Sequence, residues 1–203
     1  QGEKVSFAGV APNIIYRAED RKLVSIDGLG VWPKAITPDY FQKNHGGKIP
    51  AGVLRSVVPA APDSWLTALE HYGTMTFGEV AAAAIRFARD GFPMHNLMAE
   101  VIAEQEANYR RWPSSVAVFL PNGRPPRVGE LFVQADLGRT LQYLADEEKA
   151  NARKGRAAGI QAVRDAFYKG DIAQKIVAYH EENGGLLRRE DLADFRVRFE
   201  PTV

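Results

Sequence analysis

The spacing of apolar residues changes near residue 63, and this change most constrains what the chain can fold into. Before that point, apolar residues come in short strand-like runs. After it, they recur every three to four residues, the period of a helix buried along one face. The clearest stretch places six apolar residues at i, i+3, i+4, i+7, i+8 and i+11: Phe77, Val80, Ala81, Ala84, Ile85 and Ala88. We therefore expect an α+β fold that is mostly helical.

Start and stop signals bound the predicted helices. Asp63 can cap the first helix, which Gly73 ends, and Thr76-Phe77-Gly78-Glu79 has the capping-box pattern that opens the second. A short helix is predicted over 38–44, and the rest by periodicity over 95–111, 136–153, 157–167, 171–182 and 190–194. The Pro- and Gly-rich stretch 113–129 is predicted to be a bend.

The strand signals lie at the two ends of the chain. Two β-rich runs, 5–16 and 23–27, flank the charged stretch 17–22, which predicts an N-terminal β-hairpin with a polar tip. At the other end, alternating Phe195, Val197 and Phe199 indicate a strand that the chain end cuts short. The predicted organisation is a hairpin and loop segment over 1–62, a helical region over 63–194 and the start of a strand over 195–203.

Charge and composition exclude several classes of partner. Lys and Arg number 26 against 25 Asp and Glu, so no broad attraction for nucleic acid or an anionic membrane is expected. No apolar run approaches the ~20 residues of a membrane span. The chain has no cysteine, which leaves the compartment, periplasmic or cytoplasmic, open. Because Gln1 is neither an initiator Met nor part of a signal peptide, we expect the natural start to lie elsewhere.

Motifs that carry chemistry are scarce. Gly28-Leu29-Gly30 follows a strand but lacks the third glycine and the helix of a dinucleotide fingerprint. The basic run 149–164 has acidic residues interleaved, which favours a solvated, ion-paired face over a nucleic-acid stripe. The histidines are in four separate segments without metal-ligand spacing: His45, His71, His95 and His180. From the residues alone we expect no metal, no cofactor and no recognisable active site.

Several segments, taken in order, resemble the large subunit of gamma-glutamyltransferases. The resemblance begins with the hairpin and continues through Pro33-Lys34-Ala35-Ile36-Thr37 and Val58-Pro59-Ala60-Ala61-Pro62-Asp63-Ser64-Trp65. It then continues through 72–75, 84–92, 167–173 and 184–193. No single segment is specific, but the ordered set covers nearly the whole chain. The chain is thus similar to an internal part of that subunit.

This resemblance implies an αββα N-terminal-nucleophile hydrolase, made as a precursor that cleaves itself. A threonine then becomes the first residue of a small subunit, and its free amine acts as its own base. The intact enzyme would transfer or hydrolyse the γ-glutamyl group of a small-molecule amide. Its partners would be the remaining large-subunit sequence and the small catalytic subunit. The chain contains no T-x-H segment to match the nucleophile, so we expect no catalytic residue here and a fragment that is inert alone and self-associates.

Two alternatives remain open. One is an amidohydrolase or acylase of the same fold that acts on a substrate without the γ-glutamyl head. The other is a non-catalytic packing or interaction module, since likeness of fold does not establish function. A T-x-H segment in the reading frame after Val203 would favour the enzyme.

One departure from the family bears on the substrate. In typical gamma-glutamyltransferases, the segment after the second strand of the hairpin has the pattern D-x-R-E-x-x-P. The arginine of this pattern holds the donor's α-carboxylate with two charge-assisted hydrogen bonds. When Asp27 and Pro33 are aligned with the first and last residues of this pattern, Leu29 takes the position of the arginine. A register slip or an arginine elsewhere would explain this without a change of substrate. Otherwise the resemblance implies an altered substrate-pocket wall that includes Gly28, Leu29, Gly30 and Trp32.

Overall fold

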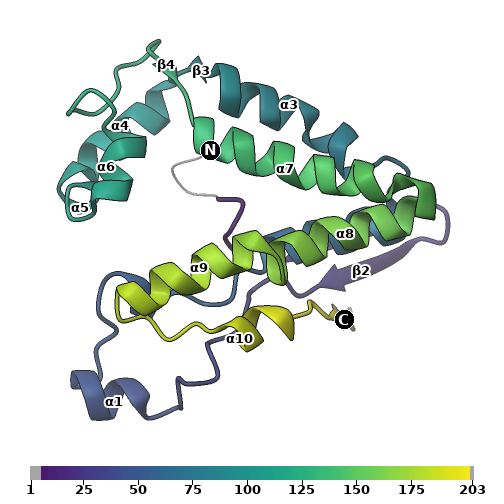
Figure 1. Cartoon of the computed structure of the whole chain (residues 1–203), viewed down its shortest axis with the longest axis horizontal. Coiled ribbons are helices and arrows are strands. Elements are labelled where there is room, and N and C mark those ends of the chain that lie inside the picture. The colour runs from purple at the N-terminus through teal and green to yellow at the C-terminus, as the bar shows by residue number, and fades with distance from the viewer. Residues whose placement is uncertain (1–5, 202–203) are drawn as a thin grey trace. The chain divides into compact units, whose positions relative to one another are not determined.

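The computed structural model describes residues 6–201 and divides them into two compact units. One unit combines residues 7–77 with the segment that follows residue 146. The other is formed mainly by residues 78–146, which lie between those two segments in the sequence. Figure 1 labels the elements of both units. Among the described residues, no helix has the length and apolar character needed to cross a membrane.

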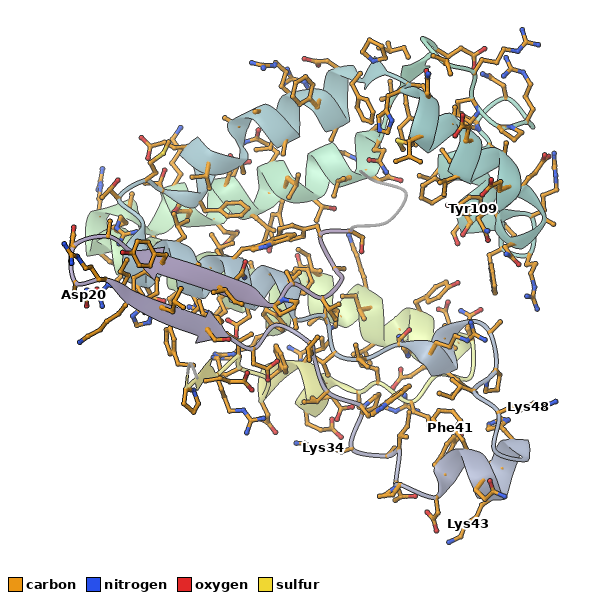
Figure 2. The ribbon with its side chains drawn as sticks, turned by 180° about the vertical axis from the view of Figure 1, so that it is seen from behind. Asp20, Lys34, Phe41, Lys43, Lys48 and Tyr109 are labelled. Carbon is orange, nitrogen blue, oxygen red and sulfur yellow. The ribbon has the colours of Figure 1, made fainter. Side chains whose placement is uncertain are left out.

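The first unit contains the predicted hairpin. Strand β1 (Asn13–Arg17) pairs antiparallel with β2 (Lys22–Ile26), and the polar turn between them carries Asp20 at its tip (Figure 2). The first strand begins only at Asn13, because Pro12 has no N–H for a ladder. Beyond it, the Ala11 N–H donates to the Gly28 carbonyl in the same register. The predicted start at Val5 lies outside the described residues.

The strand near residue 199 is present but short. Strand β5 (Phe199–Glu200) pairs antiparallel with β2, which gives the sheet order β1-β2-β5. Phe195 is buried, as the alternation predicts. The strand does not extend back to it, because the Val197 N–H donates to the carboxylate of Asp63 rather than to a neighbouring strand.

Five α-helices complete this unit: α1 (Tyr40–His45), α2 (Ala61–Tyr72), α8 (Arg156–Tyr168), α9 (Asp171–Glu182) and α10 (Arg189–Ala193). Helix α8 contacts both α2 and α9, and α10 contacts α9. The helices α8, α9 and α10 follow one another in Figure 1 from green to yellow. Their core includes the fully buried Leu66, Ile160, Phe167 and Leu187. The Phe7 ring packs against Phe167 at 5.8 Å between ring centroids.

A buried polar network joins α2 to α8. Asp63 is fully buried in the first turn of α2, so the helix begins before it and Asp63 is not the predicted cap. Its Oδ1 accepts a hydrogen bond from Nε of Arg164, and its Oδ2 accepts one from the Val197 N–H at 2.8 Å. Arg164 is only 4% exposed. The prediction of a solvated face over 149–164 is therefore wrong at this residue, which shares its side of α8 with the apolar core.

Two further residues of α8 form hydrogen bonds at the two ends of α2. The Tyr168 hydroxyl accepts the Asp63 N–H at 3.1 Å and donates to the Pro59 carbonyl at 2.6 Å. Burial raises the pKa of Tyr168, which keeps this hydroxyl protonated. At the other end of α2, Arg156 donates to the carbonyls of Leu69 and Glu70 at 3.1 and 2.9 Å. Arg156 therefore satisfies carbonyls that the end of α2 leaves unpaired.

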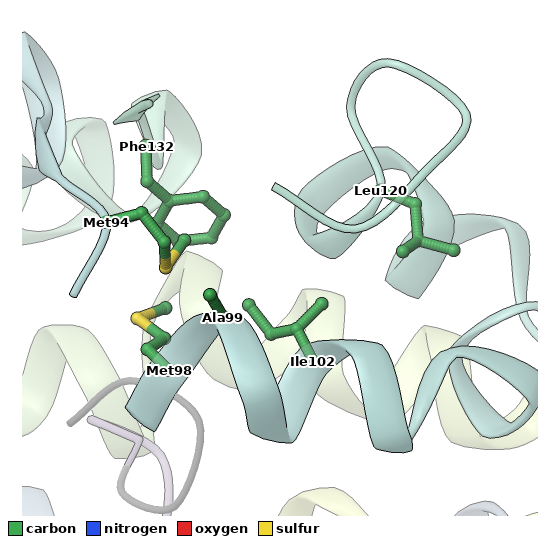
Figure 3. Close-up of a cluster of buried hydrophobic side chains, with 6 residues drawn as sticks. All are labelled: Met94, Met98, Ala99, Ile102, Leu120 and Phe132. Atoms are coloured by element: carbon green, nitrogen blue, oxygen red, sulfur yellow. The ribbon is translucent and has the colours of Figure 1, made fainter. Parts of the chain in front are cut away.

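The second unit is built from most of α3 (Phe77–Asp90), α4 (Asn96–Glu104), α5 (Glu106–Tyr109), α6 (Pro113–Phe119) and most of α7 (Ala135–Asn151), whose last residues belong to the first unit. Strands β3 (Phe92–Pro93) and β4 (Leu131–Phe132) form a two-stranded ladder. Figure 3 shows the core beside α4: Met94, Met98, Ala99, Ile102, Leu120 and Phe132. On α3, Ala81, Ile85 and Ala88 are buried whereas Val80 and Ala84 are exposed, so the apolar face is narrower than the pattern suggests.

Two predictions in this unit are wrong in detail. The single helix expected over 95–111 is divided at Gln105 into α4 and α5. The bend expected over 113–129 contains α6, because a proline is well tolerated in the first turn of a helix, where its missing N–H costs nothing. His95 precedes α4 as its cap, and its Nδ1 accepts the Met98 N–H at 3.2 Å.

Candidate functional site

The four predicted wall residues lie together on the loop between β2 and α1. Gly28 is buried and Gly30 is half-buried, whereas Leu29 and Trp32 are 60% and 40% exposed. The Leu29 N–H donates to Oδ1 of Asp27 at 3.0 Å, which fixes the turn just after β2. The loop therefore exposes two apolar side chains, Leu29 and Trp32, while its glycines are more buried.

Close backbone packing explains the two glycines. The Ala11 N–H donates to the Gly28 carbonyl at 2.7 Å, and a Cβ on Gly28 would lie 2.0 Å from the Ala11 oxygen. Gly30 has a φ of +77°, and a Cβ there would lie 2.3 Å from the Val58 oxygen. The loop is thus held between two backbone segments, neither of which leaves room for a side chain.

The far end of the loop is anchored to α1 and α10. Trp32 packs edge-on against Phe41 of α1, with 5.6 Å between ring centroids. The Lys34 N–H donates to Oδ1 of Asp191 at 2.9 Å, and its ammonium pairs with Asp194. The hydrogen bond with Asp194 raises the pKa of Lys34. Figure 2 shows Lys34 and Phe41 at this end of the unit. The lysine charge is thus already paired.

No arginine replaces the expected one on this loop. Across residues 6–201, no arginine side chain hydrogen-bonds to the loop 28–32, and Leu29 carries no charge. The nearby Arg55 donates to the carbonyls of Pro50 and Ile49 instead. The exposed side chains of Leu29 and Trp32 suit the apolar part of a ligand, and neither of them offers a positive charge to a carboxylate.

A cavity of about 320 Å³ lies in the same unit. Its lining includes Val57, whose side chain would be 3.1 Å from a Cβ on Gly30, and it also includes Arg55 and His180. The sequence offers little signal for this cavity, because its lining comes from three segments far apart in the chain. No group of three or more His, Asp or Glu residues in the described part of the chain is placed to hold a metal ion.

Comparison with known proteins identifies the family. The sequence model of the gamma-glutamyltranspeptidase family matches residues 11–203. The chain belongs to this family. The glutathione hydrolase proenzyme of Escherichia coli is 29% identical over 191 residues, which cover 90% of this chain and 30% of that protein. The acylase ACY 1 proenzyme of Pseudomonas sp. strain SE83 is 27% identical over 197 residues, which cover 92% of this chain and 33% of that protein. The chain thus spans about a third or less of these gamma-glutamyltranspeptidase relatives.

Solved structures agree on the fold. The Helicobacter pylori gamma-glutamyltranspeptidase has a TM-score of 0.84 at 26% identity, covering 98% of this chain and 54% of that one. The cephalosporin acylase of Bacillus halodurans has a TM-score of 0.81 at 26% identity, and the match covers 98% of this chain and 35% of the acylase chain. These matches confirm the predicted α+β fold of a gamma-glutamyltranspeptidase-type N-terminal-nucleophile hydrolase. Because hydrolases of glutathione and acylases both match, membership of the family does not choose the substrate.

Proposed function

We propose that the intact protein is an amide hydrolase or acyltransferase whose nucleophile is the N-terminal threonine of a small subunit. The names of the relatives, glutathione hydrolase and acylase, support this class of reaction. In this proposal the present chain supplies scaffold and pocket wall, and its partners are the remaining large-subunit sequence and the small catalytic subunit. A packing module without catalysis is the competing role, and a T-x-H segment beyond Val203 would argue against it.

We further propose that the preferred substrate is an amide whose recognition does not depend on an α-carboxylate. The observation that carries this proposal is Leu29, an exposed apolar residue where the family pattern has an arginine. A substrate carboxylate buried against Leu29 without a partner would cost about 2–5 kcal/mol of binding free energy. The exposed ring of Trp32 on the same loop favours an apolar group instead. Gly28 and Gly30 contribute by holding the loop in place.

Introducing the missing charge tests this proposal. We expect Leu29→Arg in the full-length enzyme to raise kcat/KM for glutathione roughly 10- to 100-fold, because a charge-assisted hydrogen bond contributes about 1.5–3 kcal/mol. The same change should lower kcat/KM for an amide with an apolar acyl group. Steady-state kinetics on both substrates measure the switch.

Leu29→Gln is the matched control, because it adds a polar group of moderate length without charge and should leave glutathione a poor donor. The isolated 203-residue chain serves as the blank, since we propose that it has no turnover of its own. The proposal fails if the unmodified enzyme turns over glutathione with the efficiency typical of its family and Leu29→Arg does not raise kcat/KM for glutathione.

The exposed face of the hairpin leads to a prediction for the isolated chain. Ile14 pairs with Ser25 and Tyr16 pairs with Leu23, so all four side chains lie on one face of the sheet. Ile14, Tyr16 and Leu23 are 76%, 60% and 48% exposed, and β1 is an edge strand. We expect the 203-residue chain to self-associate through this face, and Ile14→Lys with Tyr16→Lys to reduce the association.

Sedimentation velocity over a range of concentrations measures this association. Val80→Lys is the control, because Val80 is an exposed apolar residue on α3 and its replacement should leave the association unchanged. A chain that sediments as a monomer at all concentrations and binds little hydrophobic dye would contradict the prediction.

A further inference from the structure

The cavity in the first unit has the size and lining of a small-molecule site. Its volume of about 320 Å³ equals roughly ten waters' share of liquid volume and reaches the lower end of the range for ligand pockets. Most of its wall is apolar and comes from Val10, Val57, Pro59, Ile176 and Leu187. A cavity of this kind therefore favours a ligand with an apolar body.

Arg55 gives the cavity a positive charge that no acidic side chain within residues 6–201 balances. It is an exposed lining residue on the 3-10 turn Val53–Arg55. Its Nε and one Nη donate to the carbonyls of Pro50 and Ile49, at 3.1 and 3.3 Å. These bonds hold the guanidinium in place, yet no carboxylate of the described residues forms an ion pair with it. Among the described residues, no Asp or Glu lines the cavity. The charge therefore favours an anionic ligand.

His180 is another lining residue of the same cavity. The residue is 6% exposed at the end of α9, and its Nδ1 has no hydrogen-bond partner within the described residues. Gly185 lies beside this nitrogen, since a Cβ there would be 2.3 Å away. Burial, aided by the charge of Arg188, lowers the pKa of His180, so the ring is neutral near pH 7. A buried ring nitrogen without a partner is uncommon in folded proteins, and this one lies beside Gly185, which does not line the cavity.

We propose that this open cavity binds a small organic acid, with the carboxylate held by Arg55 and the apolar body resting on Val57 and Ile176 beside His180. The proposal does not depend on the reaction of the intact enzyme. It rests on the match between an apolar wall, an unbalanced guanidinium and the absence of acidic lining residues.

Binding of three six-carbon probes to the full-length protein tests the proposal: hexanoate, hexan-1-ol and hexylamine. We expect calorimetry to show hexanoate binding tighter than hexanol, and no binding of hexylamine. Hexanoate should also shift the NMR signals of the His180 ring. Arg55→Gln should weaken hexanoate binding roughly tenfold and leave hexanol binding unchanged, since it removes the charge and leaves the apolar wall in place.

Ile176→Trp should abolish binding of both hexanoate and hexanol by filling the cavity. Lys175→Trp is the matched control, because it places the same bulk at an exposed position on the same helix. Should Ile176→Trp fail to fold, the selective effect of Arg55→Gln decides the question. The proposal is overturned if hexanoate does not bind saturably to the full-length protein, or if neither Arg55→Gln nor Ile176→Trp changes its affinity.

Discussion

Replacing Arg164 with methionine is expected to lower the free energy of unfolding by about 3–5 kcal/mol. The change leaves the Asp63 carboxylate fully buried with the Val197 N–H as its remaining hydrogen-bond donor. Methionine keeps the length and the helix propensity of the side chain, so the lost charge dominates the effect. Denaturant unfolding of the protein that carries this chain measures the loss.

Two variants show whether the loss comes from the stranded charge. Arg153→Met removes an exposed arginine and should change stability by less than about 0.5 kcal/mol. The double variant Asp63→Leu with Arg164→Met should recover a large part of the loss, because both charges then leave the core. An Arg164→Met protein as stable as the Arg153→Met protein would show that the buried pair does not hold α2 to α8.

Gly28→Ala is expected to destabilise the protein by about 3 kcal/mol and to displace the loop that carries Leu29. The new Cβ would lie 2.0 Å from the carbonyl oxygen of Ala11. That oxygen belongs to the backbone and accepts hydrogen bonds from the side chains of Ser64 and Asn13, so it cannot move aside cheaply. Thermal and denaturant unfolding measure the cost.

The control for this prediction is Gly123→Ala. Gly123 has a φ of +70°, and a Cβ added there meets no atom within 4 Å. Its replacement should therefore cost only the backbone strain, about 1–2 kcal/mol. Equal losses for the two variants would mean that the contact between Gly28 and Ala11 contributes nothing to stability. On the function proposed above, Gly28→Ala should also change the kinetics on a substrate that rests against Leu29.

Local patterns in the sequence predicted most of the elements. The helices α3, α7, α8 and α9 are found where apolar periodicity and end signals place them, because these signals depend on residues within a few turns. The hairpin was predictable for the same reason. Errors arose where a partner far along the chain decides the structure. Asp63 has the local pattern of a cap, and only its contact with Arg164, 101 residues later, makes it a core residue.

The candidate site was predictable in part. Leu29 was singled out by its departure from a family pattern, and the structure shows it exposed, but its place in a substrate pocket stays a prediction. The sequence did not indicate why Gly28 and Gly30 are glycines, because their close neighbours, Ala11 and Val58, come from other segments. Nor did it indicate a role for His180, since a lone histidine in a helix has no motif.

The division of the first unit into two sequence segments bears on how the protein is made. The hairpin and α2 leave the ribosome before the later residues that pack and hydrogen-bond against them. Arg164 follows Asp63 by 101 residues, and Val197 follows it by 134. At typical rates of synthesis this separation corresponds to roughly 5 to 25 seconds. During that interval the Asp63 carboxylate lacks both of these partners, so α2 cannot be buried in its final form. Chaperone binding to the nascent chain should therefore be strongest before residue 164 emerges.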